Sequence, residues 1–139
     1  MIAFDTDVLT EILLGEPTFV ARAATIPPHE QALPVVVIKE MLRGRLQVIR
    51  QAEAGKARVS LPDAYNLFEQ TLRDVQQVTV LSYTPRADTL YRQWRHQRIR
   101  VGTHDLCIAA ICVAHVATLI SRNRRDFGQV PGLHVEFWE

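Results

Sequence analysis

Short apolar runs alternate with longer amphipathic segments along the whole chain, and this alternation restricts the fold more than any other feature of the sequence. The apolar runs at about 2–5, 33–37, 78–81, 118–121 and 134–137 have the length and composition of buried strands. Helical patterns separate these runs, and a strand–helix–strand unit closes as a right-handed crossover between parallel strands. We therefore predict an α/β fold whose central, mostly parallel sheet has four to five strands and is covered on both faces.

The intervening segments are predicted to be helices because their apolar side chains recur every three or four residues. Gly15 and Pro17 end a helix at about 6–14, and Pro27-Pro28 ends a second one at about 17–25. Two longer helices, the second at about 61–77, each have an apolar stripe that we expect to face inward: Ile38, Met41, Leu42, Leu46 and Ile49 in one, and Leu61, Tyr65, Phe68, Leu72 and Val75 in the other.

Two further helices are predicted in the second half of the chain. The first places Tyr91 and Trp94 at helical spacing with Leu90, so we expect these rings to lie in the core or at a subunit interface rather than to stack on bases. The second begins after Thr103, the predicted N-cap, and is apolar nearly all round from 106 to 113. A helix of that composition is expected to be central.

Composition indicates a globular protein with no dominant charge. The 139 residues correspond to one domain, and the net charge of +1 gives no overall positive field of the kind that indicates a nucleic-acid binder. The near neutrality hides two arginine-rich segments, at 86–100 and 122–125, each of which is either a solvated face or an anion-binding surface.

Several observations favour a cytoplasmic protein. Cys107 and Cys112 are five residues apart in a predicted helix and face different directions, so we expect free thiols, as in a reducing compartment. Asp5 and Asp7 interrupt the region where a signal peptide would be apolar. The longest apolar stretch, 106–120, is too short to cross a bilayer.

Acidic residues follow the predicted strands, and they are the best indication of function. Asp5 ends the first strand, Glu40 follows the second, Asp105 begins the apolar helix, and Asp126 follows the fourth strand together with Asn123. Ligands of open parallel sheets bind at the carboxyl ends of the strands, so these side chains can meet in one cleft. Clustered carboxylates repel one another unless a proton or a cation is shared, and Mg²⁺ is the natural cation for such oxygen ligands.

Each acid also has a purely structural interpretation. Asp7, Glu40 and Asp105 fall in predicted first turns, where the helix dipole favours a negative charge by roughly 0.3–1 kcal/mol. The joint arrangement at successive strand ends is what favours a site. Other chemistries lack their motifs: the sequence contains no HExxH, GxGxxG, GxxxxGK[ST] or GxSxG element.

Four segments, in order, resemble the PIN-domain nucleases of the VapC toxin type: Met1-Ile2-Ala3-Phe4-Asp5-Thr6-Asp7, Val37-Ile38-Lys39-Glu40-Met41-Leu42-Arg43-Gly44, Arg100 to Ala110, and Leu119 to Phe127. The resemblance extends over essentially the whole chain. It implies a single PIN domain at 1–139 with a three-layer α/β/α sandwich. It also implies an Mg²⁺- or Mn²⁺-dependent endoribonuclease acting as the toxin of a toxin–antitoxin pair.

The resemblance also assigns roles to individual residues. Asp5, Glu40 and Asp105 match the acids that hold the metal, and an amide, Asn123, stands where many PIN proteins have a fourth acid. Asp126 is expected either to supply the missing charge or to position the loop. The remaining expected site residues are the hydroxyls of Thr6 and Ser121 behind the ligands, and Arg122, Arg124, Arg92 and Arg95 for the RNA backbone.

Partners follow from the same resemblance. A small VapB-like antitoxin is expected to lie along Val8-Leu9 and Met41-Leu42, and a homodimer is expected to use the helices at about 61–94. The alternative function is a non-catalytic α/β module whose acidic pocket binds Mg²⁺, RNA or a protein without cleavage. A phospho-receiver is a weaker alternative, because Lys39 and Lys56 lie too early in the chain.

Overall fold

A five-stranded parallel sheet forms the centre of the computed structural model, which describes residues 1–139. The strands are β1 (Ile2–Phe4), β2 (Gln31–Pro34), β3 (Thr79–Leu81), β4 (Thr118–Ser121) and β5 (Val135–Phe137). Their order is β3-β2-β1-β4-β5, and every neighbouring pair is parallel. The predicted fold class is confirmed. Because β2 and β4 flank β1 on opposite sides, the chain changes direction around β1, which is where ligands bind in such sheets.

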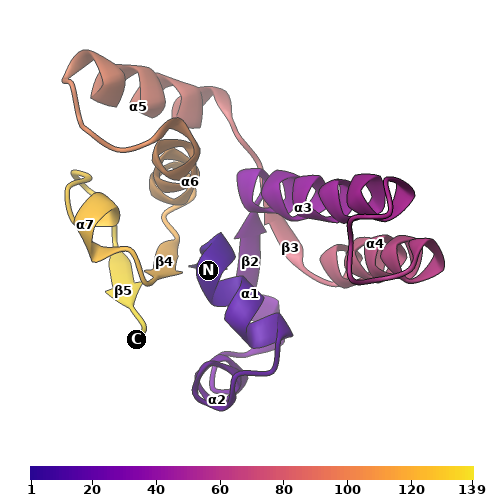
Figure 1. Ribbon diagram of the computed structural model, residues 1–139. Helices are drawn as coiled ribbons and strands as arrows, with labels where there is room; N and C mark the ends of the chain where they lie inside the picture. The colour runs from indigo at the N-terminus through magenta and orange to yellow at the C-terminus, as the bar shows by residue number, and fades with distance from the viewer.

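Helices cover both faces of the sheet (Figure 1). One layer contains α1 (Thr6–Leu13) and α2 (Pro17–Ala24), and the other contains α5 (Pro85–His96) and α6 (Thr103–Ala114). The remaining elements are α3 (Val35–Glu53), α4 (Leu61–Gln76), the short α7 (Arg124–Phe127) and a 3₁₀ turn at Pro28–Glu30. None of the helices combines the length and the apolar character needed to cross a membrane.

The α6 helix is central, as its composition predicts. Leu106, Ile108 and all residues from Ala109 to Cys112 are fully buried. Both cysteines are free thiols, in agreement with their spacing. Trp94 is also part of the core, which confirms the structural interpretation of this ring. This buried helix fixes the position of its own first turn, where Asp105 lies.

The second strand ends earlier than predicted. We expected a strand at about 33–37, whereas β2 ends at Pro34 and α3 starts at Val35. Val36 and Val37 are buried from the first turn of the helix, and an apolar run of this length does not distinguish a buried strand from a buried helical turn. As a consequence, Glu40 lies in the second turn of α3 and not in the first.

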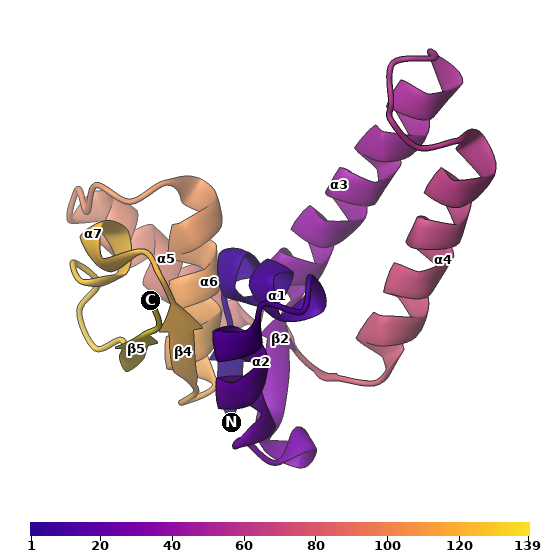
Figure 2. The same ribbon diagram turned by 60° about the horizontal axis from the view of Figure 1, so that its bottom comes forward.

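The prediction that the apolar stripes of α3 and α4 face inward was wrong in part. These two helices pack on each other and form an arm that projects from the sheet (Figure 2). Leu61, Tyr65 and Leu72 are exposed, as is Leu46, whereas Ala64 and Thr71 form the buried face of α4. Only one neighbouring helix covers α4, so its contact face is narrow and a small or polar residue fits it. Thr71 accepts a 2.9 Å hydrogen bond there from Nε of Arg45.

The start of α6 also differs from the prediction. Gly102 occupies the N-cap position without a side-chain hydrogen bond, and Thr103 is the first helical residue. The Thr103 hydroxyl instead accepts a 3.0 Å hydrogen bond from Nη2 of Arg95. Thr103 therefore links α6 to α5 at the edge of the site described next.

Candidate active site

A polar pocket of about 430 Å³ opens where the chain leaves β1 and β4, between the first turns of α1 and α6 and the second turn of α3. No hydrophobic side chain lines it. The lining residues are Asp5, Thr6, Asp7, Lys39, Glu40, Arg43, Gly102, Thr103, His104, Asp105 and Asn123. The structure thus brings together Asp5, Glu40, Asp105 and Asn123, which lie up to 118 residues apart in the sequence, as predicted from the strand ends.

Asp5 is the most enclosed carboxylate of the pocket, with 5% of its surface exposed. Its Oδ1 accepts a 2.8 Å hydrogen bond from the backbone N–H of Thr6, which makes it the N-cap of α1. Its Oδ2 accepts a 2.8 Å hydrogen bond from the hydroxyl of Ser121, at the end of β4. Burial raises the pKa of Asp5 to about 6, with a smaller contribution from the charge of Asp105, although the two hydrogen bonds oppose the rise.

Asp105 lies beside Asn123, whose amide links it to Asp126. Nδ2 of Asn123 donates to Asp126 at 3.0 Å and, at 3.4 Å, to Asp105. Burial raises the pKa of Asp105, and the charges of Asp126 and Glu40 add to the rise, whereas His104 opposes it. Asp126 does not line the pocket, and its backbone N–H donates to Oδ1 of Asn123 at 3.2 Å. The geometry therefore makes Asp126 a support for the Asn123 amide.

Glu40 reaches the pocket from α3, where one neighbour holds it and a second touches it. The hydroxyl of Thr6 donates a 2.8 Å hydrogen bond to Oε2 of Glu40. Nε2 of His104 touches the same oxygen, but the contact is outside hydrogen-bond geometry, so this buried nitrogen has no hydrogen-bond partner. Thr6 and Ser121 thus hold two of the three acids, which is the supporting position predicted for both hydroxyls.

The donor atoms of the pocket fit a hard divalent cation. Four of the eleven lining residues are carboxylates, Asn123 and two threonines offer further oxygens, and no cysteine reaches the pocket. The ligand chemistry is therefore that of Mg²⁺ or Mn²⁺ rather than of a thiophilic metal. The pKa values of Asp5 and Asp105 are raised because burial makes their negative charges unfavourable. A bound cation would stabilise these charges. No three His, Cys, Asp or Glu side chains converge on a single point, so the pocket is not a closed coordination sphere.

The arginines expected to bind RNA are mostly engaged elsewhere. Arg122 pairs with Glu11 at 3.5 Å, and Arg124 pairs with Glu139 at 3.1 Å. Arg92 pairs with Asp88 at 2.8 Å on its own helix. None of the four predicted arginines lines the pocket, and only Arg95 touches a lining residue, Thr103.

Sequence reasoning missed four lining side chains that carry charge or titrate: Asp7, Lys39, Arg43 and His104. Two of them adjoin acids that were identified, since Lys39 precedes Glu40 and His104 precedes Asp105. Arg43 lies one helical turn after Lys39, a spacing that places both on one side of α3. The spacing within the helix was therefore a usable signal.

The family model and a relative of known name agree on the family of this chain. The model of the PIN domain family matches residues 2–133. The chain is 30% identical to the protein named Ribonuclease VapC1 of Rickettsia felis over 100 residues, which cover 72% of this chain and 70% of that protein.

Solved structures show the same fold. A DNA-bound VapBC from Salmonella typhimurium matches with a TM-score of 0.78 and 18% identity, covering 99% of this chain and 98% of that one. A toxin–antitoxin complex from Klebsiella pneumoniae matches with a TM-score of 0.72 and 20% identity, covering 96% of this chain and 95% of that one. With the family match extending over nearly all of its length, the chain belongs to the PIN-domain family, on its VapC branch.

Proposed function

We propose that this protein is a metal-dependent endoribonuclease that acts as the toxin of a toxin–antitoxin pair. The observation that carries the proposal is the fully polar pocket that Asp5, Glu40 and Asp105 line together at the carboxyl ends of the strands. The name of the Rickettsia felis relative supports ribonuclease activity. The proposed activity is hydrolysis of RNA phosphodiester bonds.

Asp5, Glu40 and Asp105 would hold Mg²⁺ or Mn²⁺. When bound, such an ion lowers the pKa of a coordinated water and neutralises charge on the phosphate. Asp5 is held by hydrogen bonds to both of its oxygens, so its carboxylate is oriented before any ligand arrives. Thr6 orients Glu40 in the same way. Asn123, a neutral amide supported by Asp126, positions water or phosphate beside Asp105 without adding charge.

The antitoxin surface predicted from the sequence needs a correction. Val8 and Leu9 are buried in the core, so a partner cannot lie along them. The exposed apolar side chains at the C-terminal end of α1 are Leu13 and the C-cap residue Leu14, and they line a groove of about 440 Å³ with Met41 and Leu67. Thr6 and Glu40 line both this groove and the polar pocket. We propose that a small VapB-like antitoxin occupies this groove and reaches the site from it.

The test is RNA cleavage by purified variants. Asp5→Asn and Asp105→Asn should abolish cleavage that depends on Mg²⁺ or Mn²⁺, because each removes a charged ligand while preserving the shape of the side chain. Asp63→Asn is the matched control, since Asp63 is an exposed first-turn acid of α4 outside the pocket. The control should cleave like the wild type.

Growth after induction tests the toxin role separately. The wild-type chain should arrest cells, Asp5→Asn should not, and co-expression of the small neighbouring gene should restore growth. If the folded wild-type protein binds RNA with unchanged growth and no cleavage, the alternative function, a non-catalytic binding module, is correct.

A further inference from the structure

Two cations of the polar pocket have no partner within the protein. Lys39 and Arg43 are exposed on α3, and neither side chain makes an ion pair or a hydrogen bond. They are also the only lysine and arginine side chains that line the pocket. Every other lining side chain is acidic or neutral, apart from the imidazole of His104.

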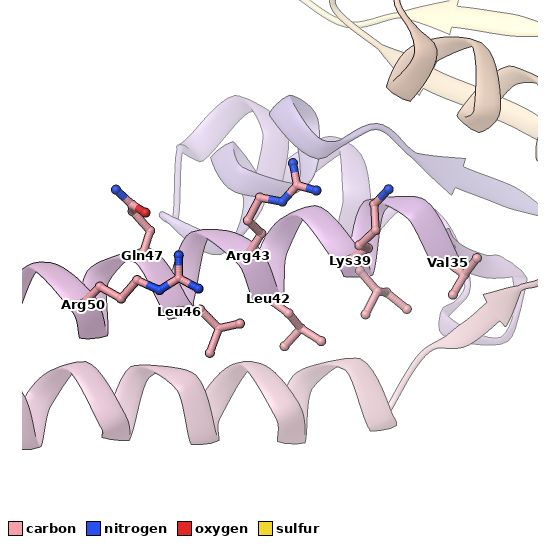
Figure 3. Close-up of a pocket in the computed structure, with 8 residues that line it drawn as sticks. Val35, Lys39, Leu42, Arg43, Leu46, Gln47 and Arg50 are labelled. Carbon is pink, nitrogen blue, oxygen red and sulfur yellow. The ribbon is translucent and has the colours of Figure 1, made fainter.

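Their geometry suits a chain of phosphates. Residues four apart on a helix lie on the same side, with Cβ atoms about 5–6 Å apart. Figure 3 shows Lys39 and Arg43 projecting together from α3, on the side away from α4, whereas Leu42 and Leu46 extend toward α4. The two positive groups therefore form a pair that borders the acids along one wall.

Lys39 and Arg43 form a positive wall of the pocket, and further positive charge lies beyond α3. Lys39 and Arg43 also line a groove of about 680 Å³ along α3, so they stand between that groove and the acidic pocket. Burial raises the pKa of the Cys107 thiol in α6, and the charges of Lys39 and Arg95 oppose this rise. Lys39 and Arg95 are thus both close enough to the first half of α6 to act on the Cys107 thiol, and they add positive charge near the site.

A polyanion needs such a wall to approach this pocket. The acids that would hold a metal repel the phosphates on either side of the bond to be cleaved, and a bound ion neutralises only the charge nearest to it. Arginine binds phosphate through two parallel N–H groups, and lysine contributes a point charge. The arginines predicted from the sequence lie outside the pocket, where Arg122, Arg124 and Arg92 each pair with an acid. Lys39 and Arg43 are the only lysine and arginine side chains that line the pocket beside its acids.

We propose that Lys39 and Arg43 bind consecutive phosphates of a single-stranded RNA and position the strand against the acids of the pocket. This inference rests on the proposed ribonuclease function, and it assigns the substrate-positioning role to α3 rather than to the 122–125 segment. An unpaired strand is the form favoured here, because side chains that emerge from one wall of the pocket contact one backbone at a time.

The experiment measures binding without cleavage. A fluorescein-labelled single-stranded RNA of mixed sequence, on the order of 12 nucleotides long, is titrated by fluorescence anisotropy in EDTA at several salt concentrations. Removing both charges with Lys39→Gln and Arg43→Gln should weaken binding by about tenfold or more at low salt, and should lower the slope of log K against log salt by about 1–2. Each single variant should show roughly half of the change in slope.

Arg50→Gln is the matched control. Arg50 is an exposed arginine on the same helix and lines the α3 groove, but it does not reach the polar pocket. Its loss should change neither the slope nor the affinity by as much as either single variant. Because all three side chains are exposed, thermal unfolding of the variants should match the wild type, which separates lost binding from lost folding.

The outcomes distinguish this inference from the proposed function. Weaker binding by the Lys39 and Arg43 variants supports the phosphate contacts even if added Mg²⁺ or Mn²⁺ produces no cleavage, in which case the nuclease proposal fails alone. If the Lys39 and Arg43 variants bind RNA with the affinity and salt slope of the wild type, and the wild type cleaves RNA, the inference is overturned and the nuclease proposal stands. Unchanged RNA binding with lost affinity for the antitoxin also overturns it, since the two cations would then bind a protein.

Discussion

The hydroxyl of Ser121 donates a 2.8 Å hydrogen bond to Oδ2 of Asp5, joining two residues that are 116 positions apart in the chain. Ser121 is fully buried at the end of β4, directly beside the end of β1. The same hydroxyl oxygen accepts a 3.0 Å hydrogen bond from the backbone N–H of Asn123. One side chain therefore holds the most buried acid of the site and the loop that carries its amide.

Ser121→Ala should shift the acid limb of metal-dependent cleavage to higher pH. The hydrogen bond from Ser121 lowers the pKa of Asp5, so its removal lets burial raise that pKa further. The variant should also lose about 1–2 kcal/mol of unfolding free energy, because the N–H of Asn123 loses its acceptor as well. A pH–rate profile and urea unfolding measure the two effects. Ser82→Ala, which alters an exposed serine, should show neither effect, and an unshifted acid limb in Ser121→Ala would contradict the role of the hydroxyl.

The metal-free protein should lose stability through Asp5 as the pH rises from about 4 to about 6. The pKa of Asp5 is raised from 3.8 to about 6 in the folded protein, so the folded state holds a proton that the unfolded state has released in this window. Full ionisation then costs at most about 3 kcal/mol, at roughly 1.4 kcal/mol per pH unit. Urea unfolding in EDTA across this pH range measures the effect. The quantity of interest is the unfolding free energy of the wild type minus that of Asp5→Asn.

The difference removes contributions from other carboxyl groups, some of which have the opposite sign, such as Asp88 with its lowered pKa. Asp5→Asn should be the more stable protein above pH 6, with little difference near pH 4. Saturating Mg²⁺ should stabilise the wild type more than the variant. A wild type that gains stability relative to Asp5→Asn on going from pH 4 to pH 6 would contradict the assignment.

Measuring activity against metal concentration should distinguish the role of Asn123 from that of Asp126. Asn123→Ala should reduce turnover by roughly 10–100-fold, because it removes the amide that lies beside Asp105 in the pocket. Asp126→Asn should leave the metal concentration for half-maximal activity nearly unchanged, since Asp126 does not line the pocket. A large shift of this midpoint in Asp126→Asn would instead make Asp126 a metal ligand.

Leu14→Glu should uncouple the toxin from its antitoxin without affecting cleavage. Leu14 is 76% exposed and lines the groove beside the site, so a charge there opposes an apolar partner and leaves the core intact. Co-expression with the neighbouring small gene should no longer restore growth, whereas RNA cleavage in vitro should equal that of the wild type. Val59→Glu is the control, because Val59 is exposed outside this groove. Full rescue of Leu14→Glu would place the antitoxin on another surface.

Val116→Gly should stabilise the protein by about 0.5–1 kcal/mol. Val116 has a φ of 55° and is 80% exposed in the turn after α6, where a β-branched side chain is strained and buries nothing. Glycine adopts this conformation without strain, although its greater freedom in the unfolded chain offsets part of the gain. Thermal unfolding measures the effect, and a lower melting temperature would show that the turn does not store this strain.

The sequence was sufficient to predict the class of fold and the main acids of the site. Local periodicity separates strands from helices, and an acid directly after a strand is visible in the chain itself. Asp5 and Asp105 lie where these patterns placed them. The start of α3 was not predictable in this way, because Val35, Val36 and Val37 are apolar in either conformation and only packing against the sheet selects the helix.

The tertiary structure alone decided which charges remain free. Arg122 and Arg124 are engaged because Glu11 and Glu139, distant in sequence, lie beside them in the fold. Lys39 and Arg43 remain free, since neither forms an ion pair although both line the pocket that contains the acids. Likewise, the order of the strands places Ser121 next to Asp5, and no local pattern contains that neighbour. Spacing along the chain determines the direction in which a side chain points, whereas its partners depend on segments that only the folded chain brings together.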